Sequence, residues 1–185
     1  MIGNNEGLIP AFNVYLANMP QDVYCLIYIG FLEEMNQLGL GYLANNLLIE
    51  DAEHCALNIF NGVLHSDEWN ALVAPMVKED RDIIFGLVAV ANAFGWGEIH
   101  VQEHSSRKML ILVSNNGYEA CGYMQLRDLM DKPRCHMLPG VTAGLAELVY
   151  EKGEIDERAG IYTVKETECL CCQDQQCRFV ATYAE

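Results

Sequence analysis

The first half of the chain places its apolar residues at the spacing of α-helices. Over residues 22–48 the helical period is interrupted at Gly39 and Gly41, which predicts helix with a break at these glycines. A second helix is expected over 51–64. A third is expected over 78–94, where the apolar residues form a single stripe that one buried helix face would need. We therefore expect the first half to be mainly helical.

After Gly95-Trp96-Gly97 the pattern changes to that of strands. Alternation of polar and apolar residues predicts a strand over 98–104, and a continuous apolar run predicts another over 108–113, with a hairpin-like break between them. A third strand is expected over 117–124, and a helix that ends at Gly153 is expected over 140–152. Two last strands are expected over 161–168 and 178–183. This order predicts an α+β fold in which N-terminal helices pack on a C-terminal antiparallel sheet.

The length and composition suit one globular domain. The chain has 185 residues, of which 51% are apolar, so it can bury a core without help from a metal. We expect residues 1–20 to be an N-terminal extension and 21–185 to be a single domain. Within that domain, 21–94 would be the helical part and 95–185 the sheet and metal-binding part.

The charge of the chain excludes several classes of partner. Only 11 Lys and Arg stand against 26 Asp and Glu, which gives a net charge of −15, and no basic stripe is present. This balance argues against binding to nucleic acid or to an anionic membrane. The N-terminus lacks the basic start and apolar core of a signal peptide, and the apolar run 23–32 is too short to span a bilayer. A cytoplasmic protein is expected.

The eight cysteines are therefore interpreted in a reducing compartment, where clustered thiols indicate metal or redox chemistry. Four of them lie within nine residues, in the predicted loop between the last two strands: Cys169, Cys171, Cys172 and Cys177. Zinc favours such thiolates in a tetrahedron. Glu166 is expected on the buried face of its strand, where a cation would offset the cost of a carboxylate. Cys135, just before a predicted helix, could complete the coordination shell.

Other interpretations of the cysteines stay open at this point. Residues 169–172 contain a C-x-x-C, so a redox pair is an alternative, although such pairs sit where a strand leads into a helix. An iron–sulfur cluster also accepts four thiolates. The isolated Cys25, Cys55 and Cys121 are interpreted as small core residues.

Several motifs in the second half resemble those of one known family. They are Gly95-Trp-Gly97, Val113-Ser-Asn-Asn-Gly-Tyr-Glu119, Cys135 followed by Gly140 and Gly144, and Glu166, Cys169 and Cys177 ahead of Phe179. In this order they resemble the 4-vinyl reductase (4VR) domain family, which includes the sensory domains of phenol- and xylene-responsive activators and proteins associated with bacteriochlorophyll synthesis. The sequence departs from the family pattern at Cys171 and Gln173, which replace Ala and Gly, and Cys172 is an additional thiol.

The resemblance implies a structural zinc site and a ligand pocket. The zinc ligands would be Cys135, Glu166, Cys169 and Cys177, with Cys171 and Cys172 as alternates. The fold would be like that of a TRAPP subunit, with a pocket between the sheet and the helices for a small aromatic or hydrocarbon ligand. Aromatic residues near the motifs are the candidates for lining it, namely Phe94, Trp96, Tyr118, Tyr123 and His136.

No enzyme signature accompanies these motifs. The chain has no P-loop, no G-x-G-x-x-G and no G-x-S-x-G nucleophile elbow. We therefore expect a sensor or carrier of a small hydrophobic or aromatic ligand that acts through a homodimer or a partner protein. The alternatives are an enzyme or accessory protein of tetrapyrrole or cofactor metabolism with an iron–sulfur cluster, and an assembly subunit.

Overall fold

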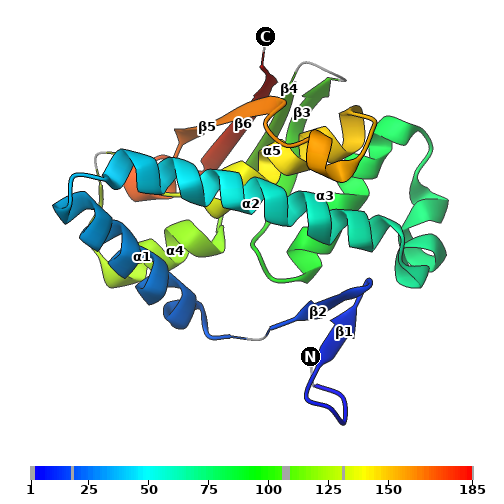
Figure 1. The fold of residues 1–185 in the computed structure, drawn as a ribbon, viewed down its shortest axis with the longest axis horizontal. Coiled ribbons are helices and arrows are strands. Elements are labelled where there is room, and N and C mark those ends of the chain that lie inside the picture. Colours follow the sequence, from blue (N-terminus) through cyan, green and yellow to red (C-terminus); the bar gives the residue numbers. More distant parts are fainter. Residues whose placement is uncertain (1–2, 18, 106–108, 131, 185) are drawn as a thin grey trace.

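The computed structural model describes residues 3–17, 19–105, 109–130 and 132–184. Their elements form an α+β fold, as the sequence predicts (Figure 1). The α-helices are α1 (Gln21–Gln37), α2 (Gly41–Leu64), α3 (Ile83–Ala93), α4 (Tyr118–Leu126) and α5 (Met137–Tyr150). The strands are β1 (Ile9–Ala11), β2 (Val14–Leu16), β3 (Ile99–Ser105), β4 (Met109–Ser114), β5 (Tyr162–Glu168) and β6 (Cys177–Tyr183). Shorter helical turns are Trp69–Val73, Ala74–Met76, Asp80–Asp82, Ile155–Glu157 and Leu170–Cys172.

The main sheet has the order β3-β4-β6-β5, and every neighbouring pair is antiparallel. Strand β6 is therefore central, and its first residue, Cys177, lies opposite Ser114 at the end of β4. The register between β5 and β6 shifts between Glu166 and Glu168. This irregularity lies where β5 leads into the cysteine-rich loop, and bulges of this kind re-aim side chains at functional sites.

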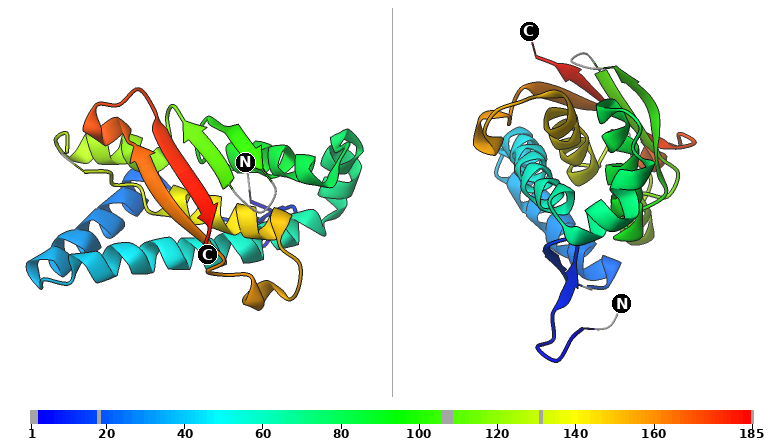
Figure 2. Two further views of the ribbon diagram at one scale, coloured as in Figure 1. Left: turned by 90° about the horizontal axis from the view of Figure 1, so that it is seen from above. Right: turned by 90° about the vertical axis from the view of Figure 1, so that its right-hand side faces the viewer.

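Helix α5 lies between the sheet and α2. Figure 2 shows the helices gathered on one side of the sheet, and nearly all of α5 is buried. Two glycines of α5 allow α2 to approach: a Cβ on Gly140 would lie 2.2 Å from the carbonyl oxygen of Ile49, and one on Gly144 would lie 2.7 Å from that of Glu53. Only glycine fits at such a distance. This contact fixes the start of α5, which follows Cys135.

Two of the predicted helix boundaries are wrong. Helix α2 runs without interruption from Gly41 to Leu64, so the break expected near residue 50 does not exist, and the break near Gly39 is the real one. Asp51, where the second helix was expected to begin, lies inside α2 and is exposed. Helix α3 begins at Ile83 and not at residue 78, after a capping box formed by Glu79 and Asp82.

The third predicted strand, 117–124, is also wrong, because this segment forms α4. Its buried residues are Glu119, Ala120, Gly122 and Tyr123. Over so short a segment, this helical spacing is hard to distinguish from alternation. The interpretation of the isolated cysteines holds for Cys25, which is buried, whereas Cys121 is half-buried and Cys55 is exposed.

The N-terminal residues form a separate hairpin of β1 and β2 (Figure 1). Its two-residue turn, Phe12-Asn13, has positive φ angles of 51° and 59°, as the tight hairpin turn that suits twisted strands requires. The ring of Phe12 packs edge-on against Phe94, and the side-chain amide of Asn13 donates to the carbonyl of His65. The hairpin-like break predicted between β3 and β4 falls on residues 106–108, which lie outside the described residues. Of the helices described, none is both long and apolar enough to cross a bilayer.

Candidate metal centre and ligand pocket

Four side chains from three separate segments converge at one end of the sheet. One ligand atom from each of Cys135, Glu166, Cys169 and Cys177 lies within 4.8 Å of the other three. The sulfurs of Cys135 and Cys177 are 3.8 Å apart. A tetrahedral zinc site with bonds of about 2.3 Å to sulfur has an edge of about 3.8 Å, so this spacing fits a tetrahedral ion. The group could therefore hold a metal ion, and it is the set that the resemblance implies.

The loop after β5 arranges Cys169 and Cys177. Cys169 begins a tight turn in which the N–H of Cys172 donates to its carbonyl at 2.8 Å, and Gln173 closes the turn with a φ of 69°. Oδ2 of Asp174 accepts from the N–H of Cys169 at 2.8 Å, and the N–H of Leu170 donates to the sulfur of Cys177 at 3.4 Å. An N–H directed at sulfur favours its thiolate form, which is the form that binds metal.

Glu166 supplies a carboxylate that is only half satisfied. Its Oε2 accepts from the N–H of Cys135 at 2.9 Å, whereas its buried Oε1 has no hydrogen-bond partner among the described residues. Burial first, and then the neighbouring Cys169, raises the pKa of Glu166 to about 9. An ionised carboxylate in such a place needs a cation beside it. A metal ion bound by the three thiols would supply that charge.

Glu119 positions this centre, and we did not anticipate its role from the sequence. This residue of α4 is fully buried beside the start of α5. Its two carboxylate oxygens accept from the N–H groups of His136, Met137 and Leu138 at 2.9–3.0 Å. Burial raises the pKa of Glu119, and these three bonds oppose that effect. A carboxylate at a helix N-terminus also complements the helix dipole. The signal was available, because an acidic residue within the mainly apolar segment 118–123 has to find partners.

The two alternate thiols are not members of the group of four whose ligand atoms all lie within 4.8 Å of one another, although both lie beside Cys169. Cys171 is buried, and its sulfur approaches the carbonyl of Ala120 on α4 at 3.7 Å. Cys172 is half-buried in the loop. Among the described residues, the ligand atoms that come together are those of the other four residues, without Cys171 or Cys172.

A surface pocket of about 280 Å³ adjoins the metal centre, and two of the four ligands line it: its walls are Asn45, Ile49, Pro133, Cys135, His136, Pro139, Val164, Lys165 and Glu166. His136 is buried in this wall, and its Nε2 pairs with Oδ1 of Asn45 at 2.9 Å. Burial lowers the pKa of His136 to about 4, so its ring is neutral near pH 7. The centre is thus close to solvent on the side of this pocket.

The five aromatic candidates fall into two groups. Tyr118, Tyr123 and His136 lie near the metal centre: Tyr118 packs edge-on against Tyr24 of α1, and His136 packs edge-on against Tyr28. Phe94 and Trp96 lie elsewhere, in the turn between α3 and β3. The structure therefore does not bring the five together around one cavity.

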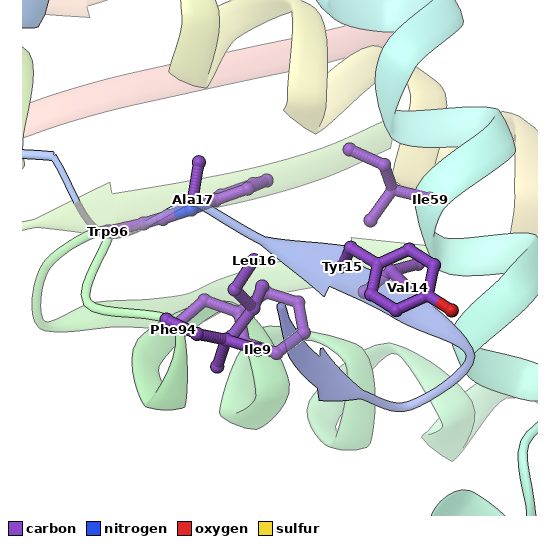
Figure 3. A pocket seen from close by; sticks show the side chains of 8 residues that line it. All are labelled: Ile9, Val14, Tyr15, Leu16, Ala17, Ile59, Phe94 and Trp96. Carbon is purple, nitrogen blue, oxygen red and sulfur yellow. The ribbon is translucent and has the colours of Figure 1, made fainter. Parts of the chain in front are cut away.

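Phe94 and Trp96 line a pocket of about 310 Å³ beneath the N-terminal hairpin (Figure 3). The hairpin and the residue after it supply five of the eight lining residues, and α2 supplies one: Ile9, Val14, Tyr15, Leu16, Ala17 and Ile59 complete the wall. Trp96 also packs edge-on against Phe60 and Phe94. We refer to this space as the hairpin pocket. Its volume lies at the lower end of the range for sites that bind small molecules.

The space between the sheet and the helices, where the resemblance implies a pocket, is filled. The cavity there measures about 10 Å³ and is lined by apolar residues of α3, α5 and the sheet, among them Val88, Leu112, Val141 and Phe179. This is about the space of one water molecule. The described residues thus leave room for a ligand at the surface and not inside the core: in the hairpin pocket and in a pocket of about 450 Å³ lined by Val73, Met76, Phe85 and Ala89.

No model of a known protein family matches the sequence, and no curated protein matches it. Solved structures are similar to it. The phenol-responsive sensory domain of the transcription activator PoxR, with phenol, matches with a TM-score of 0.69 and 15% identity over 99% of this chain and 84% of that one. Subunit 3 of a trafficking protein particle complex from Naegleria fowleri, covalently bound to palmitic acid, matches with a TM-score of 0.59 and 14% identity over 89% and 95%. A vinyl-4-reductase family protein from Methanocaldococcus jannaschii matches with a TM-score of 0.53 and 12% identity over 92% and 85%.

These similarities show that the chain has a 4VR-like fold, as the motifs around Cys135 and Cys177 indicate. The same fold is found in the trafficking-complex subunit, in agreement with the expected TRAPP-like architecture. At identities of 12–15% the similarity concerns the fold alone.

Proposed function

We propose that this domain binds a small aromatic or hydrophobic molecule in the hairpin pocket and acts as a sensor or carrier. The observation that supports this most directly is the lining of that pocket, which combines Phe94 and Trp96 with aliphatic residues from two other elements. Such a lining selects ligands by apolar contact and shape. The proteins of similar fold hold phenol in one case and palmitic acid in another, which is the class of ligand proposed.

The metal centre is assigned a structural role in this proposal. Cys135, Glu166, Cys169 and Cys177 would hold zinc, and four protein ligands fill its tetrahedron, so that no position is left for a substrate. The ion would tie the loop before α5 to β5 and β6. An iron–sulfur cluster is less consistent with a carboxylate in the group and with Cys171 outside it. All eight cysteines are free, which suits the reducing cytoplasm.

The signal would leave the domain through self-association or a partner protein. Ligand in the hairpin pocket would contact β1–β2, α2 and the turn at Phe94 together, so its binding would fix the position of the hairpin on the helices. A ligand shifts an equilibrium only by as much as its affinities for the two states differ. The hairpin is the element for which such a difference is expected.

Ligand binding is tested by thermal-shift and calorimetric titration with phenol, longer alkylphenols and fatty acids. We expect stabilisation by at least one of these, and its loss in Ile59→Trp, which fills the hairpin pocket. The comparison variant is Ala89→Trp, which fills a separate surface pocket of about 450 Å³ against α3 and should leave binding unchanged if the hairpin pocket is the site. No stabilisation by any compound, or equal binding by Ile59→Trp, would refute the proposed site. Metal analysis should find one zinc per chain, and iron with sulfide would refute the zinc assignment.

A further inference from the structure

Helix α1 has two apolar faces, and only one of them is covered by its own chain. The inner face is buried against α2 and α4 through Cys25, Tyr28, Ile29 and Leu32. The outer face carries large apolar side chains at i, i+3, i+4 and i+8, exposed by 37–69%: Val23, Leu26, Ile27 and Phe31. A surface helix normally has one apolar stripe, with charged and polar residues on the opposite side. The outer stripe of α1 therefore needs an explanation.

Gly30 lies in the middle of this stripe. A Cβ built on it would meet nothing within 4 Å, so no neighbour in its own chain requires a glycine there. A glycine in a helix interior costs about 1 kcal/mol relative to alanine. Small residues in a helix surface allow a second helix to approach closely, as Gly140 and Gly144 do where α2 packs on α5. At Gly30 none of the described residues occupies this space.

Helix α1 leads into α2 through a short turn at one end of the molecule (Figure 1). The turn and the first part of α2 add further large side chains exposed by 43–81%: Leu38, Leu40, Tyr42, Leu43 and Leu47. Taking roughly 150–250 Å² for each complete side chain, the nine residues expose roughly 1,000 Å². The largest apolar patch of a typical monomer is about 300–600 Å². A stable interface takes about 800 Å² from each partner, so the patch is large enough for one.

We propose that this surface is a self-association interface, in which α1 of one copy packs antiparallel on α1 of a second copy with the crossing point at Gly30. A two-fold axis packs the patch of one copy against the same patch of the other copy. An apolar stripe that needs no charge partner is complementary to itself in this arrangement.

The charges around the stripe favour a second copy over a lipid surface. The flanking residues that ionise are acidic, namely Asp22, Glu33 and Glu34, and the whole chain has a net charge of −15. Glu33 is already paired with Arg127 of its own chain through two hydrogen bonds of 2.8 and 3.1 Å. An anionic membrane would repel this surface. Two copies also repel each other as a whole, so added salt should strengthen the dimer.

The test is the mass in solution, measured by sedimentation equilibrium over a range of concentrations. We expect a dimer for the wild type, a dissociation constant raised at least about tenfold by Ile27→Glu, and no change in the control Phe85→Glu, which alters a large apolar residue of α3 that is exposed by 48%, against 69% for Ile27. Gly30→Leu should also weaken the dimer, although leucine favours the helix, and its monomer should melt no lower than the wild type. These variants leave the hairpin pocket intact, so ligand binding is measured separately on each.

Three outcomes would overturn the proposal. The first is a wild type that stays monomeric at every concentration tested. The second is a dimer that Phe85→Glu weakens and Ile27→Glu does not. The third is a wild-type monomer that floats with phosphatidylcholine vesicles through Ile27, which would make the stripe a lipid-binding surface.

Discussion

The backbone N–H of Cys135 donates to Oε2 of Glu166 at 2.9 Å, so two residues of the metal centre that are 31 positions apart hold each other in place. The other oxygen of Glu166 is left for the cluster of thiols. The carboxylate of Glu166 therefore connects the loop before α5 to the metal centre. Supporting contacts of this kind orient ligands and raise metal affinity.

The charge of Glu166 is expected to be needed for metal binding. Glu166→Gln keeps the size of the side chain and an oxygen for the Cys135 N–H, but it removes the negative charge. We expect the affinity for zinc to fall at least about tenfold, measured by competition with a chelating dye. Glu168→Gln is the control, because Glu168 pairs with Gln176 and lies outside the converging group. Equal affinities for the two variants would exclude Glu166 as a ligand.

Loss of a thiol ligand should cost both the metal and stability. Cys177→Ser is expected to abolish stoichiometric zinc and to lower the melting temperature, because Cys177 begins the central strand β6 and ties it to two other segments. A chelator should lower the melting temperature of the wild type by a similar amount and that of the variant very little. Cys172→Ser is the matched control and should keep its zinc; a variant that loses it would place Cys172 in the coordination shell.

The convergence of Cys135, Glu166, Cys169 and Cys177 could be anticipated from local signals for three of them and from the family resemblance for Cys135. Three of them lie within twelve residues around one loop, and the strand period places Glu166 on the inner face. The hairpin pocket could not be anticipated. Four of its lining residues come from the two three-residue strands of the hairpin, and Ala17 follows them; strands this short are too short for any hydrophobic period to be visible. Its position on α2 depends on long-range contacts, such as that of Asn13 with His65.

The errors in the predicted elements have a related cause. Helix α2 continues past Asp51 because α5 packs along it, and that packing depends on Gly140 and Gly144, about ninety residues later in the chain. Tertiary contacts of this kind override local signals for breaks. The resemblance pointed to the motifs of the site. It could not predict that the space between the sheet and the helices is filled, because that depends on the sizes of individual side chains, such as Phe179.

The approach of α2 to α5 should tolerate no side chain at Gly140. Gly140→Ala places a Cβ 2.2 Å from the Ile49 carbonyl oxygen and 2.6 Å from the Cβ of Ala52, both on the rigid inner side of α2. We expect a loss of about 1–3 kcal/mol in the free energy of unfolding, measured in urea. Gly62→Ala is the control, since its nearest contact is an ordinary 3.5 Å to Val14, and it should be neutral or slightly stabilising. Similar losses in both variants would mean that helix packing is not the cause.

Glu147 should make the stability of the fold depend on pH. It is fully buried in α5, where its Oε1 accepts from the N–H groups of Ile161 and Tyr162 at 2.8 and 3.1 Å. Burial, and then the neighbouring carboxylate of Glu53 on α2, raises the pKa of Glu147 from 4.5 to about 8. A proton on Glu147 removes the repulsion between the two neighbouring carboxylates, which is why Glu53 favours the protonated form.

The sign of this dependence follows from proton binding. Between about pH 4.5 and 8 the folded protein keeps a proton on Glu147 that the unfolded chain has lost, so the free energy of unfolding falls as the pH rises through this window and is constant above it. We expect a loss of about 2–4 kcal/mol between pH 5 and 8.5, measured by urea unfolding. Glu147→Gln has no proton to lose and should show a flatter profile. The metal ligands, which protonate in acid, act in the opposite direction in both proteins, so the difference between the two profiles isolates Glu147. If the profiles coincide at equal zinc content, Glu147 is ionised in the folded protein throughout this range.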